Sequence, residues 1–445
     1  MSNASNLAGF STVITPPSDL NVGIITAVSA NVTNLDVSAG VVTAATLSGT
    51  TVSATTVSAG GSVTGVDVYA TTTTSNSLVV NGNNYPSNGS FSFRNLVMNG
   101  DMRICQVSED YGISTTASGL WVDRFVDEFN GGAVTQSQQS LTAGSPYEEG
   151  HRNFLRLANT TAGSTVSTDY RSVKQTIEAQ NVATSGWKYT DTSSYVTLSF
   201  WIRSSVAQEF YGYLKTNDGT ESRYAFSTGS LSADTWTKVT KTIPGYSNLT
   251  FDNDVGGGLE INISAFWGTN YTDSGVTTDT WANYASGTRT PDFTSTWNTT
   301  SNATFDVTGI QLEVGDKVTP FERRPYSVEL ELCRRYFERI ELISVGAQSI
   351  VTSGHGGLNA PMPMLRITPK RIVPTASFGG QTGNIQFFHY TNSVWTATSV
   401  AAWFSTSNAA KEQFMAYYPI ATTSGINYLI RTSVGYLFVY LSAEY

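Results

Sequence analysis

Charged residues are almost absent from the first fifth of this 445-residue sequence. Only 13% of the whole chain is charged, about half the share of an ordinary soluble domain. Up to Phe93 the charged side chains are Asp19, Asp36 and Asp67, and the first basic residue is Arg94. The segment is nevertheless rich in Val and Thr, whereas disordered segments usually combine high net charge with few β-branched residues. We therefore expect a repetitive, tightly associated structure there, with a flexible Thr/Ser linker as the alternative.

Other absences exclude whole classes of protein. The net charge of −9 argues against nucleic-acid binding, which needs a basic face. No run of 18 or more apolar residues is present, so we expect no membrane insertion, and the first residues lack the features of a secretory signal. Two cysteines, Cys105 and Cys333, exclude a disulfide framework. A single bridge between them stays open, although two buried free thiols are favoured.

The motifs of the common enzyme classes are also missing. The three histidines, His151, His355 and His389, do not have metal-ligand spacing, and neither a phosphate-binding loop nor a nucleophile elbow occurs. His355 lies between glycines, which is more typical of an exposed loop than of a catalytic one. Acidic residues that are neighbours in the sequence do not by themselves make the pair needed for glycoside cleavage. We therefore expect neither an enzyme nor a required cofactor, with a polysaccharide-degrading spike as a minor alternative.

A repeat of five residues stands out in the charge-poor segment. Apolar residues recur at this spacing at Val32, Val37, Val42, Leu47, Val52 and Val57. Five is odd and a strand alternates faces every two residues, so the chain must turn or bulge once per repeat to keep these residues on one side. One buried Val per repeat contributes about 2 kcal/mol. Ordering five residues costs about 5 kcal/mol or more. We therefore expect several identical chains, as in a homotrimer, to share one axis in a β shaft.

The segment before the repeat has a different character. Residues 9–17 combine an apolar cluster with a double proline, which suits an extended segment docked into another protein; a simple cap is the alternative. The anchoring residues predicted there are Phe10, Val13, Ile14, Pro16 and Pro17.

The rest of the chain predicts β domains. Many short alternating segments fill residues 90–325, and the clearest is 195–203, where Val196, Leu198, Phe200 and Ile202 share one face. These segments indicate a jelly-roll-like β-sandwich. Residues 327–340 predict a helix with an apolar stripe, and the last hundred residues alternate again.

Four segments of the chain resemble a domain family of bacteriophage tail-fibre proteins, cyanophages included. They are Asn95–Gln106, Phe200–Ser204, Trp236–Gly245 and Val307–Phe337. The N-terminal segment is also similar to the start of cyanophage structural proteins. The resemblance implies a sandwich similar to carbohydrate-binding modules, and with it possible glycan binding. It is weaker near Pro369, where Lys370 and Arg371 depart from the family pattern.

Together these features predict an all-β fold in five parts. They are a virion attachment segment (1–26), a repetitive β shaft (27–89), a jelly-roll β-sandwich (90–325), a connecting helix (326–341) and a C-terminal β tip domain (342–445). We expect a homotrimeric fibre on the outside of a phage particle, on the tail rather than the capsid. Its N-terminus would contact other virion structural proteins, and its distal domains would adsorb to a host surface glycan. A capsid or collar decoration fibre without a specific receptor is the alternative.

Candidate site residues follow from the resemblance. Glycan-binding sites stack sugars on exposed aromatic rings, and the candidates in or near loops are Trp187, Trp267, Tyr271, Trp281, Tyr284 and Trp297. Packing in a core or a trimer interface is the alternative for each. Sandwich modules also often hold a structural calcium ion near their first and last strands. Asp101 and Asp306 lie in those places and are its candidate ligands.

Overall fold

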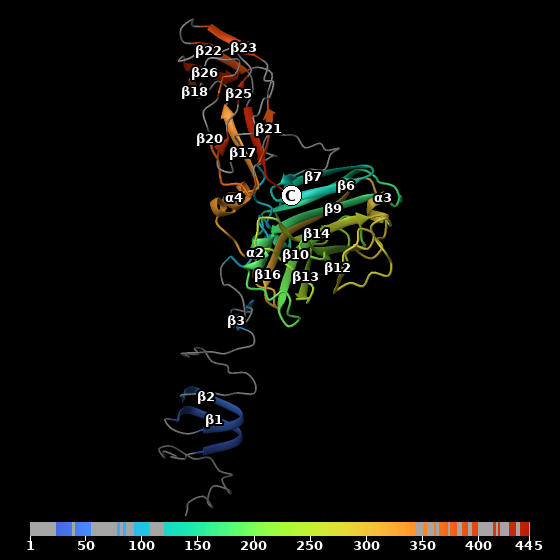
Figure 1. Cartoon of the computed structure of the whole chain (residues 1–445). Helices are drawn as coiled ribbons and strands as arrows, with labels where there is room; N and C mark the ends of the chain where they lie inside the picture. The colour runs from blue at the N-terminus through green and yellow to red at the C-terminus, as the bar shows by residue number, and fades with distance from the viewer. Residues whose placement is uncertain are drawn as a thin grey trace, which may run out of the picture. The chain divides into compact units, whose positions relative to one another are not determined.

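The computed structural model describes most of the chain after residue 93 and several earlier strands (Figure 1). The described residues are 24–37, 41–54, 78–80, 83–85, 93–106, 120–343, 350–353, 360–361, 365–372, 374–380, 385–389, 394–398, 413–414, 417–418, 427–432 and 437–444. The chain forms two compact units, Met1–Thr74 and Ser75–Tyr445. Strands dominate both, so the all-β prediction is confirmed. The predicted anchoring residues and Val57 lie outside the described residues.

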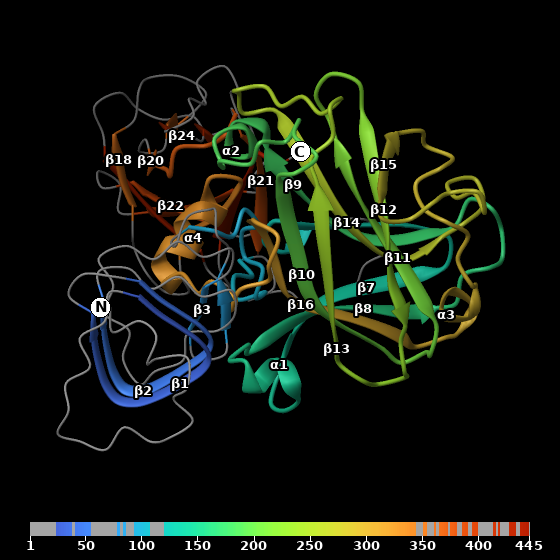
Figure 2. The same cartoon turned by 90° about the horizontal axis from the view of Figure 1, so that it is seen from below.

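The first unit contains a coil of two parallel strands, β1 (Ile24–Val37) and β2 (Val41–Ala54). Parallel strands usually need a crossover of a dozen or more residues, but only three residues separate these two. Ile24 pairs with Val41, 17 residues later, so the strands themselves curve and follow each other as successive turns. Figure 2 shows them as two bent ribbons lying side by side.

The five-residue repeat appears in the pairing of these strands. Paired residues run 24–27, 29–32 and 34–37 in β1, opposite 41–44, 46–49 and 51–54 in β2, so one position is skipped after every four. This matches the interruption that the odd period requires. The repeat residues do not stack on one another, because 17 is not a multiple of five: Val32 lies opposite Gly49, and Val37 opposite Ala54.

The second unit is built on a β-sandwich with antiparallel sheets. The five-stranded sheet has the order β13 (Thr237–Pro244), β10 (Tyr195–Ser204), β16 (Ala303–Val314), β8 (Asn153–Thr161), β7 (Ala133–Ser140). The seven-stranded sheet has the order β15 (Thr280–Asn283), β12 (Ser222–Ser230), β11 (Glu209–Thr216), β14 (Gly257–Trp267), β9 (Tyr170–Glu178), β6 (Phe125–Asn130), β5 (Leu120–Val122). Short helices α1 (Ser145–Glu148), α2 (Ala179–Ala183) and α3 (Thr296–Thr299) lie in the connections, and a small hairpin, β3 (Leu78–Val80) with β4 (Asn83–Tyr85), precedes the sandwich.

A single apolar core fills the space between the two sheets. The alternation predicted for 195–203 is confirmed, because Val196, Leu198, Phe200 and Ile202 all belong to this core. The facing sheet contributes Leu259, Ile261 and Ile263 from β14 in the same alternating manner, and these residues are also buried. This alternation determines which side chains remain on the outer face of each sheet.

The segment Asn95–Gln106, which resembles the opening strand of the tail-fibre domain family, is not a strand here. The segment is a series of turns in which Asn99 and Met102 have positive φ angles of 57° and 58°. The Asn95 amide spans the edge of β16, donating to the Ile310 carbonyl (3.1 Å) and accepting from the Leu312 amide (3.0 Å). Backbone hydrogen bonds from Leu96 N to the Leu312 carbonyl and from Ile310 N to the Gly100 carbonyl, both 2.9 Å, also join this segment to β16.

The connecting helix is shorter than predicted. Helix α4 spans Tyr326–Arg334, and the chain is already in strand β17 (Phe337–Ile343) where the sequence suggested helix up to Ile340. The Tyr336 hydroxyl donates to the buried Glu178 carboxylate at 2.7 Å, which fixes the chain at the point where it leaves the helix. No described helix has the length and apolarity to cross a membrane.

The remaining strands form the predicted C-terminal β region. One sheet pairs β17 with β27 (Leu437–Ser442), which also pairs with β21 (Thr375–Gly380). A second sheet has the order β18 (Ile350–Ser353), β26 (Asn427–Thr432), β22 (Ile385–His389), β23 (Val394–Thr398). Two short pairs complete the list, β19 (Ala360–Pro361) with β25 (Tyr417–Tyr418) and β20 (Leu365–Arg366) with β24 (Gln413–Phe414).

Ion pairs join this region to the sandwich. Arg335 forms two hydrogen bonds with Glu178 of β9, at 2.7 and 2.9 Å. Arg124 pairs with Glu444 after the last strand and lies over the Tyr336 ring. The favoured prediction for the cysteines is confirmed, since Cys105 and Cys333 are both buried and are not joined in a disulfide.

Candidate functional site

The outer face of the seven-stranded sheet carries polar and aromatic side chains. Because Leu259, Ile261 and Ile263 of β14 point into the core, Glu260 and Asn262 point outward. The same alternation places Tyr211, Tyr213 and Lys215 of β11 and Arg223 of β12 on this face. Lys215 is paired across the sheet with Arg223 on one side and Glu260 on the other.

A long connection between β14 and β16, residues 268–302, is fixed to the sheet on both sides of this face. Near β9, the Gly268 amide donates to the Asp169 carbonyl (2.8 Å). Near β12, the Tyr284 amide donates to the Glu221 carbonyl (2.9 Å). Between them, the Arg289 amide donates to the Tyr271 carbonyl (3.0 Å), so the two arms of the connection lie together.

Four aromatic rings and one guanidinium group form an aromatic cluster on this face: Tyr170, Trp267, Tyr271, Tyr284 and Arg289. Tyr170 stacks on Trp267 with ring centroids 4.9 Å apart, and Tyr271 meets both rings edge-on. Arg289 lies over the Trp267 ring at 4.4 Å and donates from Nε to the Tyr284 hydroxyl at 3.0 Å. Trp267 is buried, whereas the three tyrosines are half-buried and keep part of their rings accessible.

Charged groups surround the cluster. Lys215 binds Glu221 (2.5 Å) and lies over the Tyr284 ring at 4.7 Å. Lys174 of β9 lies between two carboxylates, Glu128 (2.7 Å) and Glu260 (3.7 Å). Aromatic rings thus lie beside donors and acceptors of hydrogen bonds on one face of the sheet.

Burial affects the titration of this face. It raises the pKa of Tyr213 far above its usual value, and the nearby Glu260 carboxylate adds to the effect. Burial also raises the pKa of Tyr170, with the Tyr271 hydroxyl as the next contribution. Both phenols therefore stay neutral hydrogen-bonding groups at neutral pH.

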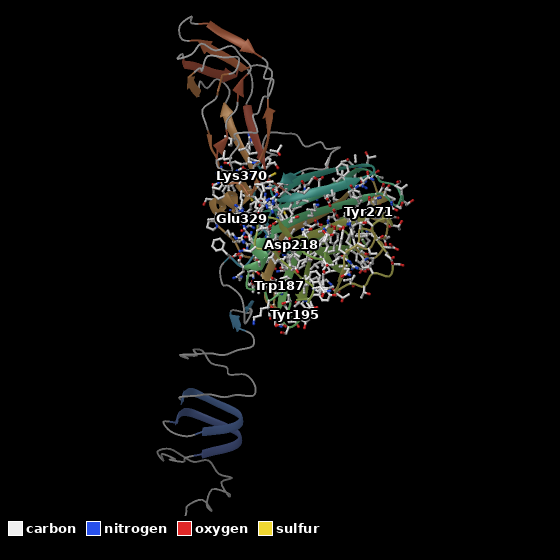
Figure 3. All side chains as sticks on the ribbon, viewed as in Figure 1. Trp187, Tyr195, Asp218, Tyr271, Glu329 and Lys370 are labelled. Atoms are coloured by element: carbon white, nitrogen blue, oxygen red, sulfur yellow. The ribbon has the colours of Figure 1, made fainter. Side chains whose placement is uncertain are left out.

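Three of the six predicted glycan-binding residues come together here, namely Trp267, Tyr271 and Tyr284. The other three belong to the core: Trp187, Trp281 and Trp297 are buried, and Trp297 is 0% exposed. Their indole N–H groups bind the carbonyls of Ser194, Pro244 and Thr304. These three positions correct the prediction, because a ring packed in the core has no face for a sugar. Trp267 is corrected for the same reason, since it is 3% exposed and supports the cluster from beneath instead of offering a ring of its own. Figure 3 shows Trp187 well apart from Tyr271.

The predicted calcium ligands have other partners. Both Asp306 oxygens accept from guanidinium groups, Oδ1 from Arg156 (2.7 Å) and Oδ2 from Arg203 (2.7 Å), so Asp306 acts as an arginine counter-ion. Asp101 lies beside Arg103 (3.7 Å), and burial raises its pKa to about 6. Within the described residues, no three His, Cys, Asp or Glu side chains are grouped so as to hold a metal ion.

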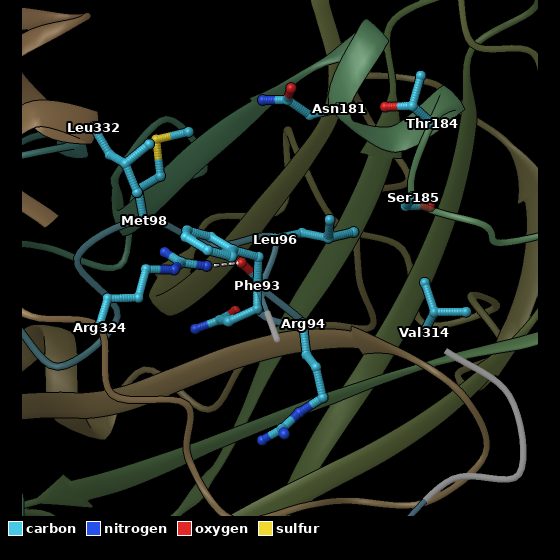
Figure 4. Close-up of a pocket in the computed structure, with 11 residues that line it drawn as sticks. Phe93, Arg94, Leu96, Met98, Asn181, Thr184, Ser185, Val314, Arg324 and Leu332 are labelled. Carbon is cyan, nitrogen blue, oxygen red and sulfur yellow. Dashed lines mark hydrogen bonds between the residues drawn. The ribbon is translucent and has the colours of Figure 1, made fainter. Parts of the chain in front are cut away.

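A separate hollow of about 350 Å³ lies where the chain enters the sandwich (Figure 4). Its walls include Phe93, Leu96, Met98, Val314 and Leu332. Arg324 also lines it, but this guanidinium is already engaged with the Asn95 carbonyl and with Glu329 at 3.3 Å. Polar side chains complete the lining of the hollow, among them Asn181, Thr184 and Ser185, so its wall is of mixed character.

The sequence interpretation missed Tyr170, Lys215, Arg223 and Arg289. Alternation in β11 and β12 signals that Lys215 and Arg223 point away from the core. Nothing in the sequence shows that the connection after Trp267 returns to this face. Arg289 therefore could not be identified as a residue of the site from the sequence.

Comparisons with known proteins find weak structural similarities. No protein-family model and no curated protein matches the chain. Among solved structures, the enzymatically active domain of bacteriophage CBA120 tailspike protein 4 is similar at 12% identity, with a TM-score of 0.28, over 49% of this chain and 21% of that one. The chain thus covers about a fifth of the tailspike.

Carbohydrate-binding modules are similar over most of their own length. The family 11 module of Clostridium thermocellum, solved with a β-1,3-1,4-mixed-linked tetrasaccharide, has 12% identity and a TM-score of 0.22 over 47% of this chain and 99% of the module. A family 30 module has 14% identity and a TM-score of 0.24 over 51% of this chain and 95% of the module.

Proposed function

We propose that the β-sandwich binds carbohydrate on the outer face of its seven-stranded sheet. The aromatic cluster is the observation that carries this proposal. Half-buried tyrosine rings can stack on the apolar face of a sugar, while Lys215, Glu221 and the tyrosine hydroxyls supply hydrogen bonds to its hydroxyl groups. A core of packed strands holds these groups in fixed positions without a ligand.

In this proposal the whole chain is a homotrimeric fibre on the outside of a phage particle. The charge-poor, repetitive N-terminus and the coil of β1 and β2 support the assignment of a fibre shaft. The sandwich supports adsorption to a host surface glycan. The N-terminal segment would attach the fibre to other virion structural proteins, on the tail rather than the capsid. A capsid or collar decoration fibre has the same parts and is distinguished by the particle position of the protein.

The proposed activity is binding without cleavage. Glu128 and Glu260 are carboxylates of this face, and both contact the Lys174 ammonium group. They therefore serve as its counter-ions, whereas glycoside cleavage needs one carboxyl group as a proton donor.

The test is a glycan array probed with the full-length chain and with the variant Tyr271→Ala/Tyr284→Ala. We expect the wild type to retain a subset of glycans and the variant to bind them at least tenfold more weakly. Tyr195→Ala is the matched control, because this half-buried tyrosine lies away from the cluster, at the start of β10 (Figure 3). Equal binding by the cluster variant, or no glycan retained by the wild type, would contradict the proposal.

The same preparation tests for cleavage. Incubation with the bound polysaccharide should leave the concentration of reducing ends unchanged. Release of oligosaccharides would show instead that the chain is a polysaccharide-degrading spike.

A further inference from the structure

Arg223 of β12 is a buried cation without a counter-ion among the described residues. It is 5% exposed, and its Nε and Nη1 atoms have no hydrogen-bond partner in the described part of the chain. It also forms no ion pair there. Burial lowers the pKa of its guanidinium group, and no neighbouring carboxylate opposes this effect.

Other buried arginines in the sandwich have more of their donors satisfied, although the Nε atoms of Arg324 and Arg171 also lack a hydrogen-bond partner among the described residues. Arg324 binds Glu329 and the Asn95 carbonyl. Arg171 donates to the Asn130, Gly131 and Tyr170 carbonyls. Removing an ion from water without a partner costs several kcal/mol. Arg223 is buried without a described counter-ion, which indicates that a bound ligand supplies the negative charge at this position.

The surroundings of Arg223 connect it to the aromatic cluster. Lys215 is its direct cross-strand neighbour and lies over the Tyr284 ring, and Tyr284 accepts a hydrogen bond from Arg289. Arg289 also has a buried Nη1 without a hydrogen-bond partner in the described chain.

Some cations of this face form ion pairs with carboxylates, and others do not. Lys215 is matched by Glu221, and Lys174 by Glu128 and Glu260. Two further carboxylates, Glu209 and Asp292, act on Tyr211, and Glu128 also acts on Arg289 at longer range. Arg223 and Arg289 nevertheless form no ion pair with a described carboxylate, and Arg223 is the more buried of the two. A guanidinium group donates two parallel hydrogen bonds, a geometry that fits a carboxylate or a sulfate.

We infer that the face binds an anionic saccharide, whose carboxylate or sulfate group is held by Arg223 while its sugar ring lies on the tyrosines of the aromatic cluster. This inference rests on the proposed function and narrows its ligand class. The tyrosine rings select a saccharide over a simple anion, and the arginines select a charged saccharide over a neutral one.

Two matched pairs of polymers test the inference with the full-length chain. Polygalacturonate and its methyl ester share a backbone and differ in carboxylate charge; dextran sulfate and dextran differ in sulfate. Dissociation constants are measured by affinity electrophoresis at fixed ionic strength. We expect the anionic member of at least one pair to bind at least tenfold more tightly than its neutral partner, and the pair that responds identifies the anion.

The variant Arg223→Gln should lose most of this preference for the anionic polymer. Lys188→Gln is the control, because it removes one positive charge from an exposed loop outside the face. Arg223→Lys keeps the charge but not the paired donors, so it should retain only part of the preference. It also replaces Arg223→Gln if circular dichroism shows that the latter is unfolded.

The outcomes separate the two proposals. If neutral and anionic polymers bind equally and Arg223→Gln changes nothing, the inference is overturned and carbohydrate binding stands. If no polymer and no arrayed glycan binds, the proposed function fails as well. If single-stranded DNA binds as tightly as the anionic polymer and depends equally on Arg223, the site recognises anions in general and the saccharide assignment is overturned.

Discussion

At the scale of single residues, buried charges hold the sandwich strands together through specific partners. Asp306 of β16 is fully buried and joins Arg156 of β8 to Arg203 of β10, so one carboxylate links three neighbouring strands. Removing one partner from such a group leaves the other charges uncompensated, which costs more than the pair itself contributes.

Asp306→Asn should therefore lower the free energy of unfolding by about 2–4 kcal/mol, a little below the range for fully buried pairs because both arginines are partly exposed. Urea denaturation followed by tryptophan fluorescence measures this. Asp316→Asn, which removes an exposed carboxylate paired with Lys317, should change stability by less than about 1 kcal/mol. Equal effects of the two substitutions on the free energy of unfolding would show that the buried ion pairs of Asp306 add no more stability than an exposed pair.

His151 predicts a loss of stability in mild acid. It is almost fully buried, and burial together with the positive charge of Arg323 lowers its pKa to about 4. In the unfolded chain its pKa is about 6.5. Between these values the unfolded state binds the extra proton, so stability falls as pH decreases through this window.

Wild type should accordingly lose about 2 kcal/mol between pH 7 and pH 5 that the variant His151→Gln does not lose. Denaturation curves of both proteins at several pH values give this difference directly. Parallel pH dependence in the two proteins would mean that His151 is protonated equally easily in the folded and unfolded states.

The sequence was informative at this scale where alternation is regular. Val196, Leu198, Phe200 and Ile202 were placed in the core correctly from their spacing alone. Trp187, Trp281 and Trp297 were not, because a tryptophan near loop residues has the same sequence signature whether its ring faces solvent or the core. The partners of Asp306 come from two other strands, and no local pattern shows them.

At the scale of elements, Glu178 at the end of β9 controls how the C-terminal strands attach. It binds Arg335 and Tyr336, the two residues between α4 and β17, and is 0% exposed. This attachment also explains why the helix ends earlier than its apolar stripe suggested. A helix continuing past Arg335 would carry the Tyr336 hydroxyl away from Glu178.

Glu178→Gln should loosen β17 and its partner β27 while leaving the sandwich intact. Hydrogen exchange should speed up in the amides of these two strands and stay unchanged in β10 and β16. The free energy of local opening of β17 and β27 should fall by about 3 kcal/mol, because Arg335 loses its buried counter-ion. Glu331→Gln, on the exposed side of α4, is the control. Faster exchange throughout the sandwich would contradict a local role for Glu178.

The sandwich could be predicted from the sequence because its strands alternate regularly. The side chains on the outer face of the seven-stranded sheet could be predicted only in part. Strand alternation gives the direction of Lys215 and Arg223. The course of residues 268–302 depends on backbone hydrogen bonds to Asp169 and Glu221, which lie far away in sequence. Element type is a local property, whereas the return of a long connection is not.

At the scale of the whole molecule, the predicted homotrimer is tested by its mass. The full-length chain should sediment as a trimer at micromolar concentration, and Val42→Thr/Leu47→Thr/Val52→Thr should shift it toward monomer. Each substitution removes about 1–2 kcal/mol of apolar burial if these residues face a shared axis. A control with serine at Thr43, Thr46 and Thr51 should remain trimeric. A monomeric wild type would refute the shared shaft.

The coil of β1 and β2 also has a mechanical consequence. Its ladder hydrogen bonds run along the coil axis, so a pull on the chain ends loads them one after another rather than all at once. Each 17-residue turn advances the chain by only about 4.8 Å, the spacing of paired strands. The same residues span roughly 55 Å when extended. Under tension this segment would open turn by turn at low force and lengthen more than tenfold. It would therefore be extensible instead of rigid.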